Sequence, residues 1–123
     1  MADEIRVQSS LVYDDSESRP VSIQIPEFLK SIATKKFIHH KVSVGFAAEE
    51  AIPLGECTSP GWAMFVNRDA TNFINLKVAT GGAIFAKLLP GEMALFRLGS
   101  GAQAPYAIAD TAACQLEYLI LQT

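Results

Sequence analysis

The sequence predicts an all-β protein: an antiparallel β-sandwich of jelly-roll type, with at most one short helix. Apolar and polar residues alternate with a period of two along most of the chain, as in strands with one buried face. Residues 58–98 hold four short apolar runs separated by Pro, Gly and Asp turns. Half of the residues are hydrophobic, which is ample for one core, so we expect a single domain over residues 1–123.

The first twenty residues are expected to form an edge strand and a solvated loop. Ile5, Val7, Leu11 and Tyr13 share one face of an extended segment, which is typical of a half-buried edge strand. The stretch DDSESRP, residues 14–20, is charged and rich in turn formers. We therefore expect an N-terminal strand or arm followed by an acidic loop.

A second strand is expected to start at residue 21 and to end at Pro26, because proline cannot donate to a sheet ladder. The spacing of Phe28, Leu29 and Ile32 then predicts one short helix or helical turn over residues 27–33. A fully extended connection is the alternative.

Alternation resumes at residues 37–46, where two histidines are adjacent. Neighbouring side chains on a strand point to opposite faces, so His39 and His40 cannot easily share one metal ion. We interpret them as partly buried or interface residues rather than ligands or bases. Residues 47–61 form a long connection that either crosses between sheets or serves contacts.

The central runs, residues 62–68, 72–79, 83–88 and 93–98, are joined so closely that we expect neighbours to pair antiparallel. Residues 62–66 are apolar on both faces, which predicts a central strand. Residues 67–72 predict a polar hairpin tip whose Asn and Asp side chains bond the backbone, and Gly81, Gly82 and Gly91 permit tight turns. The apolar run at 114–121 is expected to insert into a sheet, which gives about eight or nine strands.

Charge and cysteine usage exclude several classes of protein. The net charge is −3, with ten Lys and Arg scattered among thirteen acids, so we expect no nucleic-acid partner. No apolar run is long enough to span a bilayer and the N-terminus lacks the order of a signal peptide, so we expect no membrane partner and synthesis in a cytoplasm. Cys57 and Cys114 lack metal-site spacing and are expected to be reduced thiols, Cys114 in the core and Cys57 in a loop where it could be exposed.

No catalytic constellation is visible, so we expect a protein that acts through contacts and has no catalytic, metal or cofactor residues. Residues 62–66, 83–89 and 116–121 are apolar on both faces, which predicts exposed apolar area on an isolated subunit and a homo-oligomer. The candidate interface residues are the aromatic side chains Trp62, Phe65, Tyr106 and Tyr118.

The order PGWAMFVNRDATNFINL, a hairpin, LLPGEMALFRL and PYAIADTAACQLEYLILQ resembles small β-sandwich structural proteins of tailed bacteriophages, including head decoration or cement proteins. The resemblance covers residues 59–121, about half of the chain. It implies a non-enzymatic virion component, made in the host cytoplasm, that forms a dimer or trimer and stabilises contacts between major capsid subunits.

Two alternatives belong to other classes. The stretch PGEMALF is similar to the turn and strand of cupin barrels, which are metal enzymes or small-molecule binders. Their typical site needs His-x-His, a Glu and a later His, whereas this chain offers only His39 and His40. The other alternative is a carbohydrate-binding sandwich that uses Trp62 or Tyr106.

Overall fold

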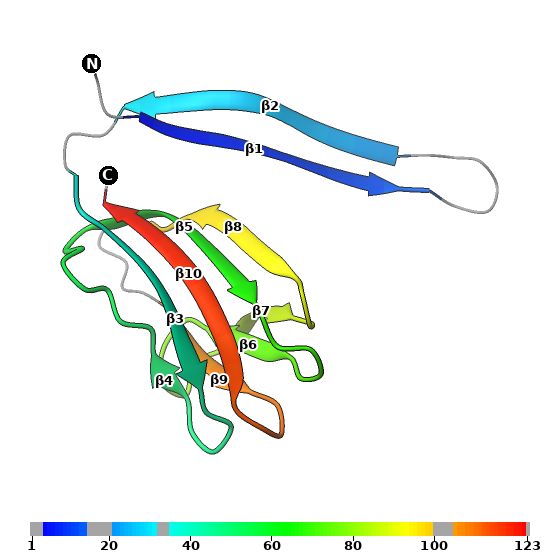
Figure 1. Ribbon diagram of the computed structural model, residues 1–123, viewed down its shortest axis with the longest axis vertical. Coiled ribbons are helices and arrows are strands. Elements are labelled where there is room, and N and C mark those ends of the chain that lie inside the picture. The colour runs from blue at the N-terminus through cyan, green and yellow to red at the C-terminus, as the bar shows by residue number, and fades with distance from the viewer. Residues whose placement is uncertain (1–3, 15–20, 32–34, 100–104, 123) are drawn as a thin grey trace. The chain divides into compact units, whose positions relative to one another are not determined.

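The computed structural model describes residues 4–14, 21–31, 35–99 and 105–122 and divides the chain into two compact units, Met1–Lys35 and Lys36–Thr123. Every regular element among the described residues is a β-strand, and all strand pairs are antiparallel (Figure 1). The predicted all-β, antiparallel class is therefore confirmed. The strands of the second unit form a β-sandwich, and those of the first form a two-stranded sheet.

The unit Met1–Lys35 contains a long hairpin, which we call the arm. Its strands are β1 (Glu4–Tyr13) and β2 (Val21–Ser31). Val7 lies opposite Phe28 and Ser9 lies opposite Ile25, so β2 carries an extra residue near Pro26. Proline is tolerated in strands at such bulges, where the ladder is interrupted. Residues 15–20 of the predicted acidic loop lie outside the described part of the chain.

One prediction for this region is confirmed and one is corrected. β1 is a strand with one free edge, as expected, and it pairs with β2 in a two-stranded sheet of its own. The predicted helix over residues 27–33 is wrong where it is described, because 27–31 continue β2 beyond Pro26. The bulge lets the strand pass the proline, and Phe28 and Leu29 then alternate between the two faces of the arm. Residues 32–34 lie outside the described residues.

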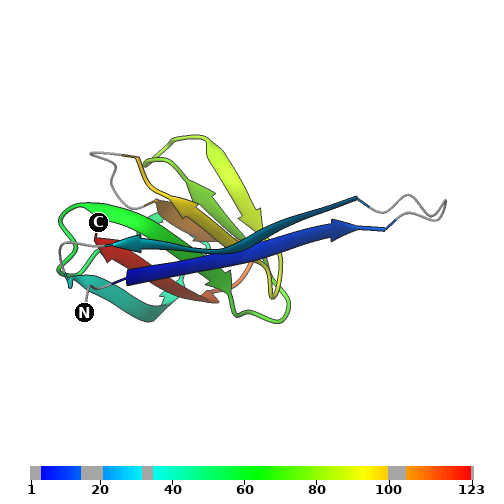
Figure 2. The ribbon, with the colours of Figure 1, turned by 90° about the horizontal axis from the view of Figure 1, so that it is seen from above.

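The unit Lys36–Thr123 is a sandwich of two four-stranded sheets (Figure 2). The first sheet has the order β3-β10-β5-β8, formed by Phe37–Val44, Cys114–Gln122, Pro60–Asn67 and Met93–Arg97. The second sheet has the order β4-β9-β6-β7, formed by Glu50–Ala51, Tyr106–Ala109, Ile74–Lys77 and Ile84–Leu88. The predicted insertion of residues 114–121 into a sheet is confirmed, because β10 lies between β3 and β5.

The strands of the sandwich pair in a nested order. β3 pairs with β10, β4 with β9, β5 with β8, and β6 with β7. Only the β6–β7 connection, where Gly81 has φ 69°, joins neighbours in one sheet, and every other connection between described strands of the sandwich crosses to the opposite sheet. The expectation that successive central strands pair is therefore right for β6 and β7 and wrong for β5–β6 and β7–β8. A short connection limits how far the next strand can lie from the previous one. A strand of the facing sheet lies within that reach, so a short connection does not require the two strands to pair.

The core lies between the two sheets. Along β5 the burial alternates, with Ala63, Phe65 and Asn67 inward and Trp62, Met64 and Val66 outward. Phe65 stacks on Phe96 and on Tyr118, with ring centroids 5.7 Å and 6.2 Å apart. The other fully buried members are Ile74, Leu76, Leu116, Ile120, Val44 and Cys114. Each large side chain of this set contributes roughly 1.5–3 kcal/mol by leaving water.

Candidate functional site

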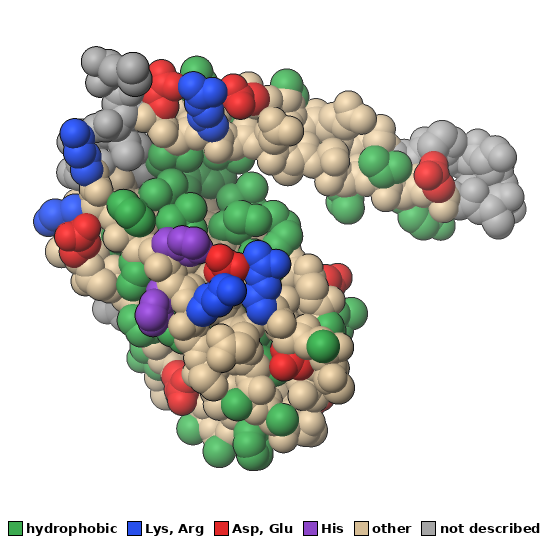
Figure 3. Space-filling view, in the orientation of Figure 1, with side chains coloured by type: hydrophobic (Ala, Val, Ile, Leu, Met, Phe, Trp, Pro, Cys, Tyr) green, Lys and Arg blue, Asp and Glu red, His purple; other side chains and the backbone are tan. Residues whose placement is uncertain are grey.

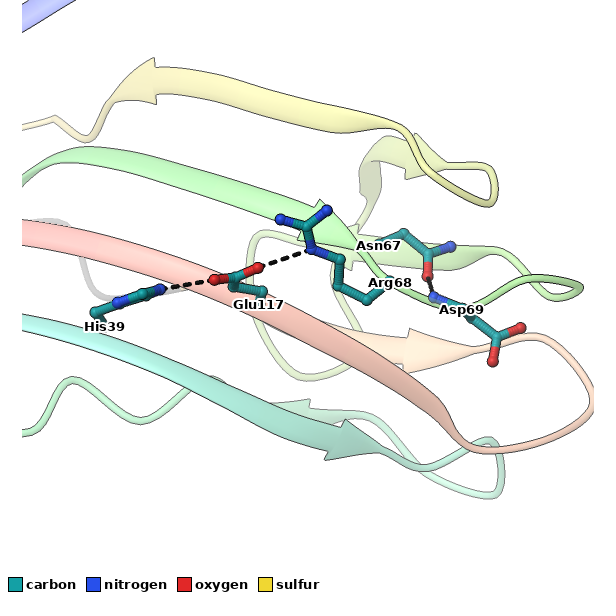
Figure 4. A network of polar contacts seen from close by, with 5 residues as sticks. All are labelled: His39, Asn67, Arg68, Asp69 and Glu117. Carbon is teal, nitrogen blue, oxygen red and sulfur yellow. Dashed lines mark hydrogen bonds and ion pairs between the residues drawn. The ribbon is translucent and has the colours of Figure 1, made fainter.

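A polar network crosses the outer face of the first sheet, where the sandwich presents three strands side by side (Figure 4). Glu117 projects from the central strand β10. One carboxylate oxygen, Oε2, lies 2.7 Å from His39 Nε2, and the other, Oε1, accepts a hydrogen bond of 2.7 Å from Arg68 Nε. β3 supplies the histidine, and the arginine follows directly after β5. Figure 3 shows basic, acidic and histidine side chains gathered on this face.

The network holds Glu117 in its charged form. Hydrogen bonds from His39 and then from Arg68 lower the pKa of this carboxyl from its ordinary value of 4.5. A carboxylate with both oxygens engaged and a lowered pKa is a poor general base. Its contacts instead fix the side chains of His39 and Arg68 at defined places on an exposed sheet.

A small pocket lies beside this network. Apolar side chains from β5 and β10, namely Met64, Val66 and Leu119, line it together with the three polar residues. Apolar side chains beside polar and charged ones are typical of a contact surface.

A second polar cluster fixes the turn after β5. Asn67 is fully buried, and its Nδ2 donates hydrogen bonds of 2.9 Å to the carbonyls of Asn72 and Leu88. Asp69 accepts hydrogen bonds from the backbone N–H groups of Asn72 and Thr71, and these hydrogen bonds, that from Asn72 first, lower the pKa of its carboxyl. The predicted bonding of Asn and Asp side chains to the backbone is confirmed, but the turn connects the two sheets and is not a hairpin tip.

The arm has one apolar face, which we call the apolar arm face. Its members in the outer part of the arm are Leu11, Tyr13, Ile23 and Ile25, and Leu11 pairs with Ile23 across the two strands. Leu11, Tyr13 and Ile23 are 74%, 63% and 61% exposed. A two-stranded sheet has no second layer to cover such a face. Figure 3 shows hydrophobic side chains, in green, on the surface of the arm.

The four aromatic interface candidates fall into two groups. Phe65 and Tyr118 are core residues, and the Tyr118 hydroxyl donates a 2.9 Å hydrogen bond to the Pro53 carbonyl, so neither is free to meet a partner. Trp62 and Tyr106 face outward on opposite sheets, on β5 and β9. They remain candidates for contacts, but they cannot form one sugar-stacking platform because the sandwich lies between them.

The histidines and cysteines occupy separate places. Leu119, opposite His39, faces outward and Tyr118, opposite His40, faces the core, so the predicted divergence of the two histidines is confirmed. Within the described ranges there is no group of three or more His, Cys, Asp or Glu side chains that could hold a metal ion. Both thiols are buried and free, and burial raises the pKa of each. Cys114 is a core residue, as predicted. The expectation that Cys57 could be exposed is wrong, because its loop folds against β10. The Cys57 Sγ lies 3.6 Å from the Ile120 carbonyl oxygen.

Comparisons with known proteins add no relative: no family model matches the chain, and neither the curated proteins nor the solved structures contain a significant match. No helix among the described residues is long and apolar enough to cross a membrane.

Sequence reasoning missed the Glu117 network and the exposed arm face. Glu117 is the only acid in the run CQLEYLIL, and a lone acid within an apolar strand is a signal for a fixed ion pair. Its partners were not predictable, because the pairing of β10 with both β3 and β5 depends on the crossing pattern. The alternation in β1 is visible in the sequence, but nothing in it indicates that the outer part of this face, with Leu11 and Tyr13, would stay exposed.

Proposed function

We propose that this chain is a non-enzymatic structural protein of a bacteriophage virion, most specifically a capsid decoration or cement protein that oligomerises and stabilises contacts between major capsid subunits. The arm is the observation that carries the proposal. It holds a row of exposed apolar side chains outside any core that the described residues form. A protein that acts alone has no use for such a face, whereas one that binds a particle does.

A jelly-roll fold is part of this proposal. The nested pairs β3·β10, β4·β9, β5·β8 and β6·β7 support it, because a long hairpin rolled into two sheets produces this order. The virion assignment itself rests on the resemblance of residues 59–121 to phage structural proteins. Jelly rolls form many unrelated proteins, so the fold alone does not name a function.

The binding free energy that one arm can supply fits a contact that several arms make at once. If a partner removes about 400 Å² of apolar surface from water, the gross gain is about 10 kcal/mol at about 25 cal/mol per Å². Association costs of roughly 4–15 kcal/mol offset much of this gain. One arm is therefore a weak anchor, and several arms on one oligomer would bind through avidity.

The test uses purified virions that contain the chain and matched particles that lack it. We expect the particles without it to break at milder heat or osmotic shock, and added protein to restore their resistance. The double variant Leu11→Ser with Ile23→Ser should bind such particles at least about tenfold more weakly, since two exposed apolar anchors are lost. Val12→Ser is the matched control, because Val12 lies on the opposite face of the same strand.

Two results would refute the proposal. One is a chain that is absent from every purified virion fraction. The other is a particle whose resistance is the same with and without the chain.

A further inference from the structure

The free edges of the sheets differ in how well they are protected against pairing with another strand. Natural proteins block such edges with short strands, bulges, prolines or charges. In the sandwich, β4 has two residues, β7 and β8 have five each, and β7 also carries Lys87 and an extra residue at Phe85. The longer edge strand β3 carries His39, His40 and Lys41. In the arm, β2 is interrupted by its bulge at Pro26.

β1 lacks all of these protections over most of its length. It has ten residues, its charges are confined to Glu4 and Arg6, and residues 7–13 contain neither a charge nor a proline. No described strand pairs along its outer side. A long, regular and uncharged edge is a template for another strand.

We propose that β1 is a strand-addition site and that its partner is β1 of a second copy of this chain. The two strands run antiparallel about a two-fold axis at Ser10, which then faces the partner's Ser10. Leu11 faces the partner's Ser9, and Tyr13 faces the partner's Val7. The proposal rests on the homo-oligomer of the proposed function and does not depend on attachment to a virion.

The alternation of β1 narrows the possible registers. Ile5, Val7, Leu11 and Tyr13 share one face, and directly opposed residues lie on the same side of a sheet. A shift by one residue would place the apolar face of one arm beside the polar face of the other. Only registers that pair odd-numbered residues with odd-numbered residues keep one continuous apolar face.

Charge then selects among these registers. With Ser10 at the axis, Asp14 lies opposite the partner's Arg6, and this ion pair occurs twice in the dimer. With Ser9 at the axis, Asp14 would instead face the partner's Glu4, which is repulsive. With Leu11 at the axis, Asp14 would face the partner's Gln8 and the ion pair would be lost. The Ser10 register therefore combines matched faces with complementary charge.

The resulting sheet has the order β2-β1-β1-β2. Four strands with one apolar face are more stable than an isolated two-stranded hairpin. The dimer also places two apolar arm faces side by side, which doubles the surface offered to a third component.

Cysteine cross-linking in the full-length chain tests the pairing. Ser10→Cys places a thiol at the axis, where the partner's equivalent thiol lies within disulfide range. Ser9→Cys places it one residue away on the apolar face, and Ser22→Cys places it on β2, on the same face as Ser10. The native Cys57 and Cys114 are buried, so they compete little. Under mild oxidation we expect S10C to form a covalent dimer at least about tenfold faster than S9C or S22C, since disulfides need close and aligned Cβ atoms.

The outcomes separate the parts of the inference. Fastest cross-linking by S9C would overturn the register, and equal rates for all three variants would overturn the pairing. If S10C cross-links but the protein fails to bind virions, the proposed attachment is wrong and the pairing stands. If the protein binds virions while S10C stays monomeric, the pairing is wrong and the attachment stands.

A charge exchange provides a second, independent readout. Asp14→Arg should raise the dimer dissociation constant about 2- to 5-fold for each of the two pairs, as expected for exposed ion pairs. Combining it with Arg6→Glu should recover most of the loss, and sedimentation equilibrium at low salt measures both effects. An unchanged dissociation constant for D14R would overturn the Ser10 register.

Discussion

The sandwich and the arm are built from the same kind of alternating strand, yet they use it in opposite ways. In the sandwich, the apolar faces of two sheets meet, and residues such as Phe65, Leu116 and Ile120 lose all contact with water. In the arm, Leu11 and Ile23 pair across two strands and stay exposed. Alternation therefore predicts which side chains share a face, but it does not predict whether other residues of the same chain bury that face.

This difference implies two kinds of sensitivity to mutation. A substitution in the sandwich should act on the free energy of unfolding, because its apolar contacts are internal. A substitution on the apolar arm face should act on assembly and leave unfolding of the sandwich almost unchanged.

The largest effect is expected from Phe65→Ala. Phe65 is fully buried and stacks on both Phe96 and Tyr118, so its truncation leaves a cavity and should lower the free energy of unfolding by about 3–5 kcal/mol. Urea unfolding followed by fluorescence measures the loss. Leu11→Ala is the control and should move the sandwich transition by less than about 0.5 kcal/mol. Equal losses for the two variants would show that the arm and the sandwich share one stabilising core.

A smaller but still large effect is expected from Asn67→Ala. The substitution removes a buried amide whose Nδ2 satisfies two carbonyls and whose Oδ1 accepts the Asp69 N–H. Each buried group left without a partner costs about 1–3 kcal/mol, so the loss should be about 2–4 kcal/mol. Asn75→Ala, whose side chain faces away from the core, should cost much less. A loss as small as that of the control would mean that water replaces the amide.

The smallest effect is expected from Glu117→Gln, and it should depend on pH. Because the folded-state pKa of Glu117 is lowered, its stabilising contribution is present above its ordinary pKa of 4.5 and is lost as the pH falls through the folded value. The stability difference between the wild type and E117Q should therefore be largest near neutral pH and shrink below about pH 4.5. Urea midpoints between pH 3 and pH 7 measure it, with Glu50→Gln on the second sheet as the control. A difference that stays constant over this range would exclude the ion network as its cause.

Much of the sandwich could be predicted from the sequence, because local signals coincide with the strands. The expected runs at 62–68, 83–88 and 93–98 match β5, β7 and β8 to within about two residues. Alternation correctly places Ala63 and Phe65 on one face of β5 and Trp62 on the other, but both faces are apolar, so it does not predict which one is buried. These features depend on neighbours in sequence, so the sequence contains them directly.

The wrong predictions share one physical cause: the structure there depends on contacts between residues that are far apart in the sequence. Proline near a helix-like spacing predicted a helix after Pro26, but pairing with β1 over a bulge stabilised a strand instead. Short connections predicted hairpins, but most of the strands in the sandwich find their partners far along the chain. Cys57 was placed in an open loop, and only the contact of that loop with β10 buries it. The Glu117 network is not predictable for the same reason, because its residues lie on β3, on β10 and just after β5, which are far apart in the sequence.

The central position of β10 sets a condition on how fast the sandwich can form. Leu121 pairs with Phe37 and Leu116 with Asn67, so the first sheet closes only when the last strand meets segments that precede it by much of the chain. Such closure has a high entropic cost and gives high contact order, and all-β domains of this kind fold in milliseconds to seconds. Until β10 arrives, β3 and β5 lack a common neighbour, and each presents an open ladder with an apolar face. During that interval the partly folded sandwich resembles the arm, because its apolar side chains are exposed. Dilution or a chaperone should therefore raise the yield of folded protein more than any single stabilising substitution.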